Sequence, residues 1–155
     1  AECSTDGSVR HVLKLGWEKF QQQYSSNDFA KISHIIELQR QLLWNGFQQL
    51  KPATGVLVYS TCSFMKQQNE QVVEWLLKRD PSAQVIEPFH DFENEEEKKV
   101  LMQMCIHNKQ QVAHQEASES IEAQVLKHTI RLDPRINTSG LYIAKIKKNK
   151  IKKGL

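Results

Sequence analysis

Apolar positions along the chain predict alternating helices and strands. Between Phe29 and Leu50 they recur every three or four residues, which indicates a helix that buries one face. A cluster of breakers then leads into the continuously apolar run from Val56 to Ser60, which is typical of a buried strand. The same patterns predict a helix over 69–78 and a strand over 83–86. Helices and buried strands that alternate in this way indicate an α/β fold.

The remaining segments give weaker or different patterns. Residues 9–24 have a helical period that Gly16 interrupts, so they predict a helix or a turn. Residues 91–123 are acidic and then Gln-rich, which we interpret as a surface insertion that can be partly helical. Two late strands are predicted over 128–132 and 141–146. Because no helix separates these strands, they indicate an antiparallel edge on an otherwise parallel sheet.

Composition indicates one globular domain or part of one, because 155 residues with 39% apolar and 25% charged content are ordinary for such proteins. The net charge of +3 does not by itself indicate a nucleic-acid partner. Lysines are nevertheless concentrated in the last eleven residues, and the end of this segment, residues 149–155, is interpreted as a basic tail. Either phosphate contacts or a solvated terminus explains these lysines, which are Lys145, Lys147, Lys148, Lys150, Lys152 and Lys153. No membrane span or signal peptide is expected, and the scattered histidines predict no metal site.

Cysteine usage points to a reducing compartment. Cys3, Cys62 and Cys105 have neither a metal-binding spacing nor the even number of a secreted disulfide framework. Cys62 follows the predicted buried strand and precedes a predicted helix, and reactive groups gather at the carboxyl edge of such strands. A small, inert, buried cysteine is the alternative interpretation at this position.

A second loop, residues 3–10, combines Cys3 with a glycine and with Arg10, whose guanidinium suits phosphate or base contacts. On its own this loop is better explained as a capped turn before a helix. This loop is therefore interpreted together with the segment around Cys62.

The two loops together resemble the Sun/nucleolar-protein family of RNA cytosine-5 methyltransferases. That family has a loop Asp-Ala-Pro-Cys-Ser that continues to Gly and Arg, then Leu-Lys-Pro, a Gly, and a strand that ends in Tyr-Ser-Thr-Cys-Ser before an Asn-Glu helix start. The matching residues cover roughly 1–80 and 128–148, and they include Cys3, Ser4, Gly7, Arg10, Leu50, Lys51, Pro52, Gly55, Tyr59, Ser60, Thr61, Cys62, Ser63, Asn69, Glu70, Ser139 and Gly140. Departures from the family pattern imply a divergent subgroup, and they are Glu2, Thr5, Lys66 and Gln68.

This resemblance implies a fold and a reaction. We expect residues 1–148 to form the C-terminal part of a Rossmann-like class I methyltransferase domain, with a mostly parallel sheet and an antiparallel edge strand. The implied methyl donor is S-adenosylmethionine, held mostly by residues upstream of this chain, so the isolated chain should be inactive. The implied substrate is ribosomal or transfer RNA. A monomer is the working expectation, and the implied location is intracellular: nucleus or nucleolus, cytoplasm or mitochondrion.

The resemblance also implies roles for single residues. The thiolate of Cys62 would attack C6 of the target cytosine, and Cys3 would assist release of the covalent adduct. Thr61 and Ser63 would hold the loop and, with Arg10, are the candidate substrate-binding residues. The alternative is a parent protein that has lost catalysis and uses the same fold as an RNA-binding or assembly module.

Overall fold

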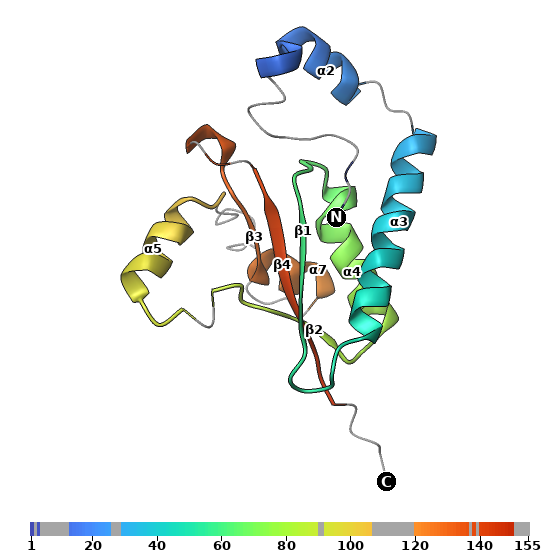
Figure 1. The fold of residues 1–155 in the computed structure, drawn as a ribbon, viewed down its shortest axis with the longest axis vertical. Coiled ribbons are helices and arrows are strands. Elements are labelled where there is room, and N and C mark those ends of the chain that lie inside the picture. Colours follow the sequence, from blue (N-terminus) through green and yellow to red (C-terminus); the bar gives the residue numbers. More distant parts are fainter. Residues whose placement is uncertain are drawn as a thin grey trace.

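The computed structural model describes residues 1, 3, 13–25, 29–89, 92–106, 120–136, 138 and 140–150. Helices and strands follow one another along these residues, joined by two short 3₁₀ turns (Figure 1). In chain order the elements are α2 (Trp17–Ser25), α3 (Phe29–Gln48), β1 (Val56–Thr61), η1 (Lys66–Gln68), α4 (Glu70–Arg79), β2 (Ala83–Ile86), α5 (Glu95–Gln103), α7 (Ile121–His128), β3 (Thr129–Arg131), η2 (Pro134–Ile136) and β4 (Tyr142–Lys148).

β4 lies in the centre of the sheet (Figure 1). β1 pairs antiparallel along one of its edges, from Val56 opposite Lys147 to Thr61 opposite Tyr142. β2 and β3 share the other edge, because β2 pairs with residues 145–148 of β4 and β3 pairs with residues 142–144. β1 and β2 therefore run parallel to each other, with β4 between them.

The predicted arrangement of the sheet is confirmed only in part. All strand pairings among the described residues are antiparallel, so a mostly parallel sheet is not confirmed. The late strand β4 is also interior rather than at an edge. The edge position was predicted wrongly because it was inferred from two alternating strands without a helix between them; in β4, buried Tyr142, Ala144 and Ile146 alternate with more accessible residues. Alternation of this kind reports that one face is covered, and it says nothing about how many neighbours a strand has.

Helices α3, α4 and α7 cover one face of the sheet. Each contributes fully or almost fully buried side chains to a single apolar core, such as Phe47 from α3, Leu76 from α4 and Val125 from α7. Burial of a side chain of this size stabilises the fold by roughly 1.5–3 kcal/mol. On the other face of β1, Val56 and Val58 remain 45% and 59% exposed. The helices thus fix the orientation of β1, whose carboxyl end carries the candidate site.

The helices and strands predicted over 29–50, 56–60, 69–78, 83–86, 128–132 and 141–146 are confirmed as α3, β1, α4, β2, β3 and β4. The α/β class is likewise confirmed. Helix α7 was not predicted, although its residue Val125 is fully buried. Within the stretch interpreted as an insertion, α5 has no buried residue and residues 107–119 lie outside the described part. The proposed division into domain, insertion and tail therefore stays a prediction.

Candidate active site

Two cysteines meet at the carboxyl end of β1. Cys62 follows the last residue of the strand, and its Sγ atom lies 2.9 Å from Sγ of Cys3, a hydrogen-bonding distance for two thiols that are not joined by a disulfide. The backbone nitrogen of Ala1 donates a hydrogen bond of 2.7 Å to the Ser60 carbonyl, which places Ala1 beside the strand end. Both cysteines are partly exposed. Two partly accessible sulfur atoms thus share one point on the surface.

The residues on either side of Cys62 are fixed by one buried side chain. Asn69 accepts a hydrogen bond from the Thr61 hydroxyl, and its amide nitrogen donates one of 2.7 Å to the Ser63 carbonyl. The Ser63 backbone nitrogen donates a hydrogen bond to Oγ1 of Thr61, 3.2 Å away. Thr61, Ser63 and Asn69 are 2%, 0% and 0% exposed. Because a buried polar network is rigid only when its members are satisfied, these bonds give the Cys62 loop one defined conformation.

Asn69 has this role instead of the one usual at its position. It is the N-cap residue of α4, where asparagine commonly bonds to a backbone nitrogen of the first turn. Here the side chain makes no such bond. The loop around Cys62 therefore uses a side chain that a helix start would ordinarily use for itself.

Tyr59 extends the network behind the loop. Its hydroxyl donates a hydrogen bond of 2.6 Å to the carbonyl of Gln68, which is itself fully buried. Burial raises the pKa of Tyr59 well above its usual range, and the charges of Cys3 and Glu70 raise it further. The phenol therefore remains a neutral hydrogen-bond donor at physiological pH.

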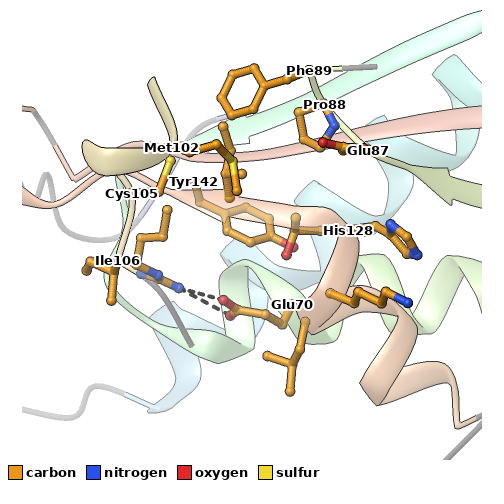
Figure 2. A pocket seen from close by; sticks show the side chains of 14 residues that line it. Glu70, Glu87, Pro88, Phe89, Met102, Cys105, Ile106, His128 and Tyr142 are labelled. Atoms are coloured by element: carbon orange, nitrogen blue, oxygen red, sulfur yellow. Dashed lines mark hydrogen bonds and ion pairs between the residues drawn. The ribbon is translucent and has the colours of Figure 1, made fainter. Parts of the chain in front are cut away.

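An ion pair supports the loop from β3. Arg131 contacts both carboxylate oxygens of Glu70, at 2.9 and 3.2 Å, and its second terminal nitrogen donates to the Ser63 carbonyl at 3.3 Å. The two side chains are 16% and 9% exposed. They line a cavity of about 360 Å³, where Figure 2 shows Glu70 joined to the guanidinium below the ring of Tyr142, with Cys105 on another wall.

A glycine is required where the last loop approaches Phe64. Gly140 has φ +67°, and a Cβ atom at this position would lie 2.6 Å from Cε1 of Phe64. Gly16 has a similar φ of +78° but open space around it. We therefore expect Gly140→Ala to lower the free energy of unfolding by about 2–4 kcal/mol, and Gly16→Ala by only about 1–2 kcal/mol. Urea unfolding of the two variants measures this difference, and equal losses would show that the contact with Phe64 is unimportant.

The structure brings together some of the predicted site residues and leaves others undescribed. Cys3 and Cys62 are in contact, whereas Arg10 and residues 151–155 of the tail lie outside the described residues. Thr61 and Ser63 are buried, and their hydroxyl oxygens bond within the loop, which favours the holding role over substrate contact. Three residues that hold the loop had no role predicted from the sequence, namely Asn69, Glu70 and Arg131. Asn69 and Glu70 belong to the motif at the helix start, but Arg131 lies 68 residues from Ser63 and gave no sequence signal.

The described part of the chain contains neither a metal-binding cluster nor a membrane-spanning helix. No group of three or more His, Cys, Asp or Glu side chains is placed there to hold a metal ion. None of the helices in the same part is long and apolar enough to cross a membrane.

Comparison with known proteins identifies the family. A family model described as 16S rRNA methyltransferase RsmB/F matches residues 1–147. The chain belongs to this family. Among RsmB/F-like proteins, it is 39% identical over 93 residues to the ribosomal RNA small subunit methyltransferase F of Shewanella amazonensis, covering 59% of the chain. It is 30% identical over 149 residues to the tRNA (cytosine(49)-C(5))-methyltransferase of Pyrococcus abyssi, covering 96% of the chain. The chain spans only 18% and 40% of the lengths of these two relatives.

Two solved structures resemble the chain. A methyltransferase homologue from Pyrococcus horikoshii matches 77% of the chain, with a TM-score of 0.52 and 28% identity, and the match covers 32% of that protein. Another solved chain matches 96% of this one with a TM-score of 0.58 at 23% identity, which shows a shared fold alone.

Proposed function

We propose that the protein carrying this chain methylates C5 of cytosine in RNA through a covalent intermediate on Cys62. The observation that carries the proposal is the contact of two thiols, 2.9 Å apart, at the end of β1 in a chain of an rRNA methyltransferase family. Relatives named for rRNA and for tRNA methylation support RNA as the substrate class. The proposed fold of the whole domain is a Rossmann-like class I methyltransferase, which acts inside the cell on its RNA.

The first step is addition of a thiolate to the base. Cytosine C5 is a weak nucleophile, but a bond between Cys62 Sγ and C6 breaks the C5–C6 double bond and leaves C5 electron-rich. Cys62 is suited to this step because it is partly exposed while its neighbours Thr61 and Ser63 are locked.

The second step removes the enzyme from the product. After C5 has gained the methyl group, loss of its proton restores the C5–C6 double bond and expels Cys62 as a thiolate. This elimination needs a base or a proton relay next to the adduct. Cys3 is the described residue best placed to assist, because its sulfur atom lies within hydrogen-bonding distance of the nucleophile.

The methyl group would come from S-adenosylmethionine, the donor that the family implies. The described residues of the site supply the thiol pair and the network behind it, and those network side chains are buried and bonded to one another. They leave no described donor or acceptor that fits this cofactor, so no residue of this chain is assigned to it. Arg10 remains a proposed phosphate contact on sequence grounds alone.

Trapping the covalent adduct tests the proposal. The full-length protein with Cys3→Ala is incubated with total RNA and S-adenosylmethionine, then denatured and examined for protein that stays attached to RNA. We expect a stable adduct, since the variant can add to cytosine but releases it slowly. The double variant Cys3→Ala with Cys62→Ala should form none.

A different result would change the assignment. If the folded Cys3→Ala protein binds both RNA and S-adenosylmethionine but forms no adduct, and the unchanged protein transfers no methyl group to RNA, the parent is a non-catalytic RNA-binding module of the same fold. Parallel reactions with purified rRNA and purified tRNA then distinguish the two substrate classes.

A further inference from the structure

Arg131 connects three parts of the chain at one point. Its guanidinium bonds to Glu70 at the start of α4 and to the carbonyl of Ser63, the residue after Cys62. It also lies 5.6 Å from the centre of the Tyr142 ring, within the range of a cation–π contact. The planar fork of arginine makes such a multiple contact possible, and lysine cannot reproduce it.

We infer that Arg131 and Glu70 form a positioning pair that sets the geometry and the charge of the Cys62 loop. The catalytic part of this inference rests on the proposed function. Arg131 acts through the backbone carbonyl of Ser63, and Glu70 acts through Arg131 and through its own charge.

Geometry supports the inference. The Ser63 carbonyl accepts two hydrogen bonds, from Asn69 at 2.7 Å and from Arg131 at 3.3 Å. The first ties the loop to the adjoining helix start, and the second ties it to β3, which is distant in sequence. With both bonds in place, the backbone after Cys62 is held from two sides, and loss of Arg131 leaves only one.

Charge supports it as well. The pair is only slightly exposed, so its charges are weakly screened and each is neutralised by the other. Burial, the charge of Cys3 and the charge of Glu70 all raise the pKa of Tyr59, so the Glu70 carboxylate acts on β1, the strand that precedes Cys62. Removing the arginine deprives the loop of one positive charge, and removing the carboxylate has the opposite effect.

Alkylation of Cys62 by iodoacetamide in the full-length protein, followed by peptide mass spectrometry, tests this directly at pH 8. We expect Arg131→Met to slow the reaction about 3- to 10-fold, because the thiolate becomes less favourable. Glu70→Gln should accelerate it by a similar factor, and Arg131→Lys should lie between Arg131→Met and the unchanged protein. The cavity beside the pair can accept the methionine side chain without repacking a filled core.

Lys78→Met is the matched control. It removes the same positive charge and an ion pair of α4, the helix that carries Glu70, but Lys78 is 64% exposed and contacts only Glu74 among its described ion pairs. We expect no change in Cys62 alkylation. In methylation assays, Arg131→Met should lower kcat while the KM for RNA is kept, because the pair orients the nucleophile and does not bind the substrate.

Several outcomes would overturn the inference. If Arg131→Met and Lys78→Met behave alike, Arg131 does not act on the loop. If Arg131→Met and Glu70→Gln both slow alkylation, the pair has only a structural role. A protein that neither methylates RNA nor forms an adduct would refute the proposed function, and the alkylation rates would still decide on Arg131.

Discussion

Replacing Cys62 with alanine in the full-length protein should abolish RNA cytosine methylation, with a fall in kcat of at least about 10³-fold. The reason is that C5 becomes a sufficient nucleophile only after a thiolate has added to C6. Cys62 is the partly exposed cysteine that follows β1, and the change removes only its sulfur atom from a loop whose hydrogen bonds come from neighbouring residues. Transfer of a labelled methyl group to RNA measures the effect.

Cys105→Ala is the control for this experiment. Cys105 is 7% exposed, its thiol donates to the Leu101 carbonyl at 3.3 Å, and burial raises its pKa. A buried thiol with a raised pKa is a poor nucleophile, so methylation should be retained. If Cys62→Ala keeps its activity and Cys105→Ala loses it, the nucleophile has been assigned to the wrong cysteine.

The local features of the fold were predictable because they depend on short-range patterns. The helical period over 29–50 and the apolar run over 56–60 each identify an element without knowledge of its neighbours. Helix α7 was not predicted because it is short and follows a long polar stretch. Its one fully buried residue, Val125, forms no visible periodicity. The interior position of β4 was not predicted because the order of strands in a sheet depends on tertiary packing.

The candidate site was predictable to a similar extent. The motif resemblance singled out Cys3 and Cys62, and the structure brings their sulfur atoms into contact. The resemblance could not reveal which residues hold the loop. In the sequence Asn69 is only part of the Asn-Glu helix start, and the structure shows that its side chain bonds to Thr61 and Ser63. Arg131 reaches the same loop from a strand that no local pattern connects with it.

Asn69→Ala should lower the free energy of unfolding by about 2–4 kcal/mol. The change leaves the Thr61 hydroxyl without its acceptor and removes one of the two donors to the Ser63 carbonyl, all in a buried environment. Asn69→Asp should be at least as destabilising, although it keeps the shape. Aspartate still accepts from Thr61, but it turns a second oxygen toward the Ser63 carbonyl and buries a charge without a new partner.

Urea unfolding of both Asn69 variants, beside Gln71→Ala as the control, measures this prediction. Gln71 is exposed on the same first turn of α4, so its loss should cost less than about 0.5 kcal/mol. If Asn69→Ala is as stable as Gln71→Ala, the network does not hold the loop. If it is destabilised but Cys62 is alkylated at the rate of the unchanged protein, Asn69 stabilises the fold without controlling the nucleophile. If Asn69→Ala both lowers the free energy of unfolding and changes the alkylation rate of Cys62, one buried amide links the stability of the sheet end to the reactivity of its cysteine.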